Sequence, residues 1–142
     1  MQQGKTIDQL EIGEKASMRK TFTESDAYRF AQISGDTNPL HIDKEYASES
    51  LFKEPVVHGM LTAGLISAVI GTRLPGVGTI YLSQSLRFTA PVKFGDTIEA
   101  EVEVVAKLEE KNRARLRTIC RNQGGQTVID GEALVMPPRK SS

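Results

Sequence analysis

The chain has 142 residues, and its 18 lysines and arginines balance its 18 aspartates and glutamates, so the formal net charge is zero. This length suits one domain, and we expect a single domain over residues 1–142 with residues 137–142 frayed. A balanced charge argues against nucleic acid as a partner, because nucleic-acid binders usually carry a basic excess. It argues equally against a polybasic membrane-surface protein.

The inventory of reactive side chains is short. Cys120 is the single cysteine, which excludes an intrachain disulfide and a multi-cysteine metal site, and we expect no metal. A lone cysteine suits a reducing compartment, and the N-terminal residues lack the apolar core of a signal peptide, so we expect a cytoplasmic protein. His41 and His58 are the two histidines. Any chemistry that needs an imidazole must use one of them.

A strand and an amphipathic helix come first in chain order. Residues 16–22 have the pattern of a strand. Thr23 and Asp26 then resemble a capping box, and small or apolar residues recur behind them at helical spacing. Gly35 is the residue type that ends a helix, so we expect a helix between Thr23 and Gly35.

An irregular loop and a short helix follow. We expect the loop over residues 36–40, because Pro39 disfavours helical geometry in the residue before it. Asp43 is expected to cap a short helix that runs through Ser50.

Residues 59–71 are apolar or small on every side. A helix of about 13 residues is ~20 Å long, which is too short to span a bilayer, so no membrane partner is expected. A helix without a polar face must be packed against neighbours on several sides. This segment therefore predicts a buried central helix.

The second half of the chain supplies strands that can cover this helix. Apolar and polar residues alternate over residues 80–88, 98–104 and 115–120, which predicts strands with one buried face each, and we expect a last strand over residues 127–136. We expect Asp130-Gly131 to mark a bulge, and Cys120 to face the core. Acidic side chains of one strand are expected to face basic side chains of the next: Glu99, Glu101 and Glu103 opposite Arg115, Arg117 and Arg121.

Together these patterns predict an α+β fold, in which an antiparallel sheet wraps around one apolar helix. Extra helical turns lie between the first strand and that helix. Four or five strands cannot close around the helix alone, so we expect the open edge of the sheet to pair with a second subunit.

A carboxylate and an imidazole lie five positions apart in the proline-containing segment after Gly35. Asp36 and His41 could hold a water molecule, because a carboxylate accepts a proton from water and an imidazole can orient it or exchange its second proton. The alternative is a structural loop in which Asp36 caps a turn and His41 satisfies a backbone carbonyl, since Asp, Asn and Pro are ordinary turn residues. The spacing alone leaves both interpretations open.

His58 and Gly59 stand at the start of the apolar helix. A helix N-terminus presents unpaired N–H groups and a partial positive charge, and glycine leaves room for a substrate oxygen to approach an amide and be stabilised there. Gly59 could equally serve tight packing, and His58 could be a half-buried structural residue. Ser67 lies in mid-helix, where a serine usually donates to a carbonyl one turn earlier.

Three segments resemble the MaoC-like (R)-specific enoyl-CoA hydratases. They are residues 28–41 with the core Gly35-Asp36-Thr37-Asn38-Pro39-Leu40-His41, the segment Val57-His58-Gly59-Met60, and residues 87–92 followed by Gly95-Asp96. The likeness extends over residues 7–136. Its Gly35–His41 core is highly specific, whereas residues 88–96 are of a kind shared more widely among hot-dog folds.

The resemblance implies a hot-dog fold that dimerises through its sheet and binds acyl thioesters near the subunit interface. It implies that Asp36 and His41 are the catalytic pair and that the amide of Gly59 holds the thioester carbonyl. Ser67 falls where such proteins often carry a serine that supports the site. Coenzyme A is then part of the substrate, and no cofactor is expected.

The implied activity is reversible hydration of a trans-2-enoyl-CoA to an (R)-3-hydroxyacyl-CoA, with Asn38 and His58 as candidate pocket residues. A dehydratase acting on (R)-3-hydroxyacyl-acyl carrier protein is an alternative with the same chemistry. A hot-dog thioesterase is a further alternative, although such enzymes usually place a carboxylate on or near the central helix and residues 59–71 contain none. A non-catalytic acyl-thioester-binding module would not need the Asp36–His41 pair. Pocket depth is expected to depend on five apolar residues: Ile66, Val69, Ile70, Leu74 and Val77.

Overall fold

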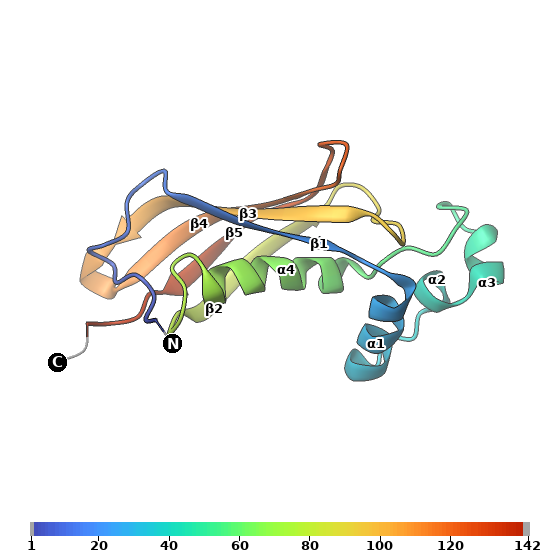
Figure 1. Ribbon diagram of the computed structural model, residues 1–142, viewed down its shortest axis with the longest axis horizontal. Helices are drawn as coiled ribbons and strands as arrows, with labels where there is room; N and C mark the ends of the chain where they lie inside the picture. Colours follow the sequence, from blue (N-terminus) through green and yellow to red (C-terminus); the bar gives the residue numbers. More distant parts are fainter. Residues whose placement is uncertain (1, 141–142) are drawn as a thin grey trace.

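Five antiparallel strands form one sheet in the order β1-β3-β4-β5-β2 in the computed structural model, which describes residues 2–140. The strands are β1 (Lys15–Thr21), β2 (Ile80–Phe88), β3 (Thr97–Leu108), β4 (Arg113–Arg121) and β5 (Thr127–Met136). The helices are α1 (Glu24–Ser34), α2 (Pro39–Ile42), α3 (Lys44–Ser48) and α4 (Gly59–Thr72), and a 3-10 turn spans Glu109–Lys111. Helix α4 lies along one face of the sheet, and α1 to α3 gather beyond its N-terminal end (Figure 1).

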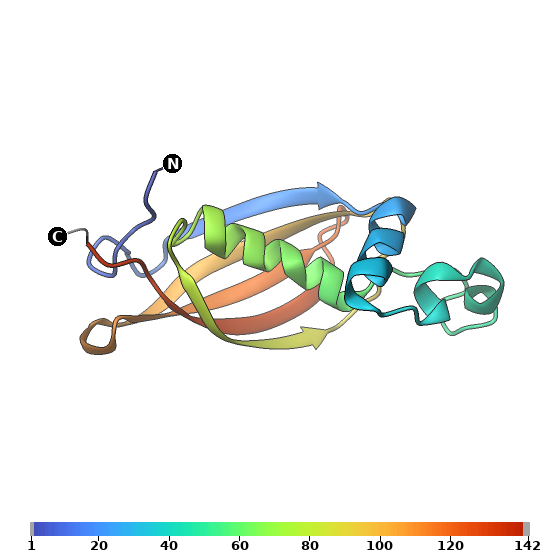
Figure 2. The ribbon, with the colours of Figure 1, turned by 90° about the horizontal axis from the view of Figure 1, so that it is seen from below.

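The sheet curves around α4, which lies in its hollow (Figure 2). One side of α4 is fully buried and packs mainly on β3, β1 and β4. Each large apolar side chain that is removed from water there stabilises the fold by about 1.5–3 kcal/mol. The core includes Leu65, Ile66, Val69 and Ile70 of α4, and Ile98, Ala100, Val102 and Val104 of β3. The expected α+β hot-dog fold is confirmed, and no helix within residues 2–140 has both the length and the hydrophobicity that a membrane crossing requires.

The expected ends of α1 are confirmed. The Thr23 hydroxyl accepts from the Asp26 amide at 3.2 Å, and the Asp26 carboxylate accepts from the Thr23 amide at 3.0 Å. Gly35 ends the helix with a φ of 82°, in the left-handed region that glycine adopts without strain.

The loop expected over residues 36–40 is shorter than predicted. Helix α2 begins at Pro39, because a proline fits the first helical position, where its missing N–H costs nothing. The Asn38 side chain caps this helix by accepting from the Leu40 amide at 3.1 Å. Asp43 caps α3 as expected, by accepting from the Tyr46 amide at 3.1 Å, although α3 ends two residues earlier than expected, at Ser48.

The bulge expected at Asp130-Gly131 is absent, since both residues pair in regular register with β2 and β4. Glycine is needed there for a different reason. A Cβ on Gly131 would lie 1.9 Å from the carbonyl oxygen of Ser85, so the two backbones could not approach as they do. The irregularity in β2 falls instead between Tyr81 and Ser83.

The expected ion pairs between β3 and β4 form only in part. Glu101 and Arg121 approach to 3.9 Å. Two of the other side chains pair with the outer neighbours of these strands instead: Glu99 binds Arg19 of β1 at 3.0 Å, and Arg115 of β4 binds a glutamate of β5 at 2.9 Å. Strands β3 and β4 each lie between two other strands, so their charged side chains can pair with a residue on either neighbour.

Strand β2 does not bury the apolar face that its alternation predicts. Ile80, Leu82 and Phe88 are 53%, 40% and 52% exposed. The physical reason is position: β2 is an edge strand, and no described segment lies beyond it.

The C-terminal segment is held more firmly than the expected fraying. Pro137 and Pro138 are buried, and the Asn112 side chain donates to the Pro137 carbonyl at 3.1 Å. Lys140 pairs with Asp8 at 3.2 Å. Residues 141–142 lie outside the described residues.

Candidate active site

The segments that carry the candidate residues meet at the N-terminal end of α4. Asp36 follows the left-handed Gly35 that ends α1, His41 lies on α2, and His58 and Gly59 begin α4. A cavity of about 450 Å³ opens there. Asp36, His41, His58 and Gly59 all line it, together with apolar side chains that include Leu40, Phe52, Val57, Phe88, Val128 and Ile129.

Backbone hydrogen bonds shape the loop around Asp36. The Asp36 amide donates to the Ser34 hydroxyl at 3.1 Å, and the Asp36 carboxylate accepts from the Asn38 amide at 3.2 Å. Asp36 therefore does cap a turn, as the structural interpretation expected. It is also exposed and lines the cavity, so its second carboxylate oxygen remains available to a ligand.

A hydrogen bond from the His41 ring to the backbone of Val56 fixes the ring in one orientation. Its Nδ1 lies 2.7 Å from the carbonyl oxygen of Val56. A carbonyl can only accept, so Nδ1 carries the hydrogen, and in the neutral ring Nε2 then has a free lone pair. The two interpretations of His41 are therefore compatible, because the hydrogen bond to the carbonyl selects the tautomer that a base would need.

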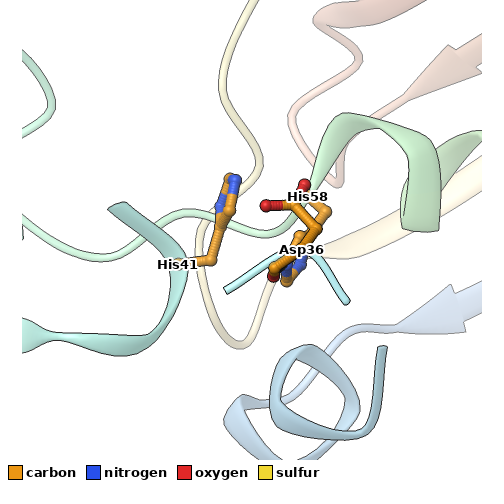
Figure 3. Close-up of side chains that lie close together, drawn as sticks. All are labelled: Asp36, His41 and His58. Atoms are coloured by element: carbon orange, nitrogen blue, oxygen red, sulfur yellow. Dashed lines mark hydrogen bonds between the residues drawn. The ribbon is translucent and has the colours of Figure 1, made fainter. Parts of the chain in front are cut away.

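One carboxylate oxygen of Asp36 and one nitrogen of each histidine lie within 4.8 Å of one another (Figure 3). A separation of no more than 4.8 Å is short enough for a single water molecule to hydrogen-bond to both the carboxylate and the imidazole. The donor set does not fit a metal ion well, because the two rings stack at 3.9 Å with an interplanar angle of 27°. Lone pairs of imidazole lie in the ring plane, so near-parallel rings do not aim them at one point.

His58 lies behind the pair and is buried, with 1% of its surface exposed. Its Nε2 donates to the backbone carbonyl of Asp36 at 3.0 Å, and its ring meets Phe30 edge-on at 4.8 Å. Nδ1 of His58 is buried and has no hydrogen-bond partner among the described residues. Burial lowers the pKa of His58, because the charged ring would lose its hydration there.

Gly59 is the first residue of α4 and lines the cavity. An amide at this position has no acceptor within its own helix, and the helix dipole adds a partial positive charge. A Cβ on Gly59 would lie 2.6 Å from the ring of Phe88. Gly59 is therefore compatible with both interpretations: the packing of Phe88 requires a glycine, and the residue that carries the first amide of α4 lines the cavity.

Two of the predicted site residues lie apart from this cluster in the single chain. Asn38 is exposed, and its side chain caps α2 rather than lining the cavity. Ser67 is exposed farther along α4, where it lines a separate groove with Met60, Gly64 and residues of β2. The supporting role expected of Ser67 stays a prediction.

The lining of the cavity differs from the expectation. Ile66, Val69, Ile70 and Leu74 are buried in the core between α4 and the sheet, and neither they nor Val77 line the cavity. The walls come instead from Phe52, Phe88 and Val128 with their neighbours. Phe88 lies in a segment that resembles the hydratase family, so the sequence did offer a signal for its place at the site. Phe52 and Val128 have no local signal, because only the packing of distant segments brings them together.

Comparison with known proteins agrees with this geometry. Residues 8–122 match the family model described as the MaoC like domain. The chain is 50% identical over 134 residues to an (R)-specific enoyl-CoA hydratase from Rhodospirillum rubrum, which covers 94% of this chain and 92% of that one. A 3-hydroxyacyl-[acyl-carrier-protein] dehydratase from Solanum lycopersicum is more distant, at 41% identity over 91% of this chain and 78% of its own.

Solved structures give the same result. The R-hydratase PhaJ1 from Pseudomonas aeruginosa superposes with a TM-score of 0.91 at 50% identity, covering 96% of this chain and 88% of that chain. The (R)-hydratase from A. caviae involved in PHA biosynthesis superposes with a TM-score of 0.88 at 48% identity, covering 91% and 98%. The chain therefore belongs to the MaoC-like domain family of hot-dog proteins.

Proposed function

We propose that this protein is an (R)-specific enoyl-CoA hydratase, a hydro-lyase that reversibly adds water to a trans-2-enoyl-CoA to give an (R)-3-hydroxyacyl-CoA. One observation carries the proposal. The Asp36 carboxylate and the tautomer-fixed His41 ring meet, within 4.8 Å, in an apolar cavity at a helix N-terminus. Hydratases at 48–50% identity over more than nine-tenths of the chain support it.

Each group takes one role in the proposed reaction. A water held between Asp36 and His41 attacks C3 of the enoyl thioester while a proton passes from the water to the pair. The negative charge that develops on the thioester oxygen is met by the amide of Gly59 and by the positive end of α4. A proton from the pair then reaches C2, so that water has been added across the double bond.

The apolar walls of the cavity suit this chemistry. Its volume of about 450 Å³ lies within the ~300–1,000 Å³ typical of small-molecule sites. Phe52, Phe88 and Val128 offer apolar surface against which an acyl chain can pack. In surroundings of low polarity, the interaction of the Gly59 amide with the developing negative charge is stronger than in water.

The alternatives separate in direct assays. We expect hydration of crotonyl-CoA with formation of (R)-3-hydroxybutyryl-CoA, whose configuration is read by a stereospecific dehydrogenase. Release of free thiol without hydration would instead indicate a thioesterase, and tight binding without turnover would indicate a binding module. A higher kcat/KM for crotonyl-acyl carrier protein than for crotonyl-CoA would indicate the dehydratase of fatty-acid synthesis.

The protein is further proposed to act as a homodimer. Support comes from β2, an edge strand whose apolar side chains Ile80, Leu82 and Phe88 are about half exposed. An open edge of this kind is a template for pairing with another strand. In a two-fold dimer the same edge would be used by both copies.

The remaining expectations complete the proposal. The reaction needs no cofactor, because coenzyme A is part of the substrate and water is the second reactant. A cytoplasmic location is supported by the single cysteine, Cys120, which is buried and reduced.

A further inference from the structure

His58 occupies a place that neither binding of substrate nor simple core packing explains. It is 1% exposed, yet it is a polar ring at the centre of the site. It touches both members of the catalytic pair: its Nε2 lies 3.0 Å from the Asp36 carbonyl oxygen, and its ring stacks at 3.9 Å on the ring of His41. It also immediately precedes Gly59, the proposed oxyanion donor.

The hydrogen-bonding pattern fixes the protonation state of this ring. Nε2 must carry a hydrogen, since the Asp36 carbonyl can only accept. Nδ1 has no partner in the described chain. A hydrogen on Nδ1 would be a buried donor without an acceptor, and it would place a charged ring against His41. A neutral ring with a lone pair on Nδ1 therefore costs less free energy than a charged ring with a hydrogen there.

We propose that His58 is a positioning residue that, as a neutral ring protonated at Nε2, holds the Asp36 loop and the His41 ring in register with the amide of Gly59. The inference rests on the proposed hydratase function. His58 does not touch the reacting atoms and does not exchange the catalytic proton. Its donor fixes the Asp36 backbone across 22 residues of sequence, and this contact sets the gap in which the water is held.

The groups around the ring agree with a neutral state. The titratable groups that face it are His41 on α2 and Asp36 on the loop, and Phe30 on α1 contributes an uncharged ring edge. Burial lowers the pKa of His58 and so favours the neutral form. No further charge is therefore placed beside His41 when it takes up a proton.

Two substitutions separate the hydrogen bond from the ring. His58→Gln keeps an N–H donor at the place of Nε2, whereas His58→Phe keeps the ring and removes the donor. We expect His58→Phe to lower kcat for crotonyl-CoA on the order of 10²-fold, because a misplacement of about 1 Å costs that much. KM and the affinity for unreactive butyryl-CoA should change little, and His58→Gln should retain most of kcat.

Each other outcome overturns the proposal. Wild-type kcat in His58→Phe would show that the donor is not needed, and a change confined to KM would make His58 a substrate-binding residue. An equal loss in both variants would assign the effect to packing. If wild-type protein itself does not hydrate crotonyl-CoA, the proposed function fails, and the placement of His58 is then judged by spectroscopy alone.

Nuclear magnetic resonance tests the ring without any assay of activity. The chain has two histidines, so long-range ¹H–¹⁵N spectra of labelled wild-type protein contain two ring systems, and the His41→Gln variant identifies the signals of His58. We expect His58 as the Nε2–H tautomer, and as a mostly neutral ring from about pH 7.5 down to about pH 6.5, the ordinary pKa of an imidazole. A hydrogen on Nδ1, or a charged ring within that range, would contradict the proposal.

Discussion

At the scale of single residues, His58 links the stability of the fold to pH. Its pKa in the folded state lies below the ordinary value of 6.5, because burial disfavours the charged ring. The unfolded chain therefore binds more protons once the pH falls below about 6.5. The contribution of His58 to the free energy of unfolding is therefore fully present above about pH 6.5, and it is lost as the pH falls from there toward the lowered pKa of the folded state.

We expect the free energy of unfolding of wild-type protein to fall more steeply between about pH 7 and about pH 5 than that of His58→Gln. Each unit of lowered pKa corresponds to about 1.4 kcal/mol of stability. Urea unfolding of both proteins at several pH values measures the difference, and His41 and the carboxylates, common to both, cancel. Parallel pH profiles of the two proteins would show that folding does not lower the pKa of His58.

Cys120 illustrates a residue whose sequence interpretation was simple and correct. The side chain is buried in the core, and burial raises the pKa of its thiol to about 12. The protonated thiol is a poor nucleophile. Cys120 therefore packs as a small apolar group and takes no part in the chemistry.

At the scale of elements, the close contact between β2 and β5 depends on Gly131. We expect Gly131→Ala to destabilise the protein by at least ~1–3 kcal/mol, the usual cost of overpacking, because its Cβ would meet the Ser85 carbonyl oxygen at 1.9 Å. Thermal unfolding measures the effect.

Gly71→Ala is the matched control, since a Cβ there meets nothing within 4 Å and helix α4 gains a better helix former. A Gly131→Ala protein as stable as Gly71→Ala would contradict the account of this contact.

Elements that depend on nearby residues could be predicted from the sequence. The capping box of Thr23 and Asp26, the end of α1 at Gly35 and the helix over the apolar run of α4 are all local signals, and each is confirmed, although only one side of α4 is buried in the single chain. The expected loop over residues 36–40 failed where two local signals compete. Pro39 restrains the residue before it, and it also begins a helix, which the Asn38 cap makes favourable.

The site could be predicted only in part for the same reason. Asp36 and His41 are five residues apart, so their proximity follows from one loop. The contact from His58 to Asp36 spans 22 residues, and the walls formed by Phe88 and Val128 come from two further strands. No pattern in one segment encodes such contacts, because they depend on how the sheet curves around α4.

At the scale of the whole molecule, the main feature is the open edge of the sheet at β2, which has no partner strand within the described chain. If β2 pairs with a second copy, Leu82→Lys should place a charge in the interface and weaken the dimer. Leu51→Lys is a matched control, because Leu51 is 88% exposed and follows α3, outside every strand of the sheet.

Sedimentation equilibrium of the two variants and wild-type protein decides this point. We expect a dimer for wild type and Leu51→Lys, and at least a tenfold weaker dimer for Leu82→Lys, since burying an unpaired charge costs more than the ~1.4 kcal/mol that a factor of ten requires. A dimer that Leu82→Lys leaves unchanged would place the interface elsewhere.

The central claim concerns the water held by Asp36 and His41, and Asp36→Asn tests it most directly. The substitution keeps the size of the side chain and an oxygen that can accept from the Asn38 amide, but it removes the carboxylate that takes the proton. The decisive measurement is kcat/KM for crotonyl-CoA hydration by a variant with wild-type thermal stability. We predict a loss of several orders of magnitude, and turnover near the wild-type rate in that folded variant would contradict the account.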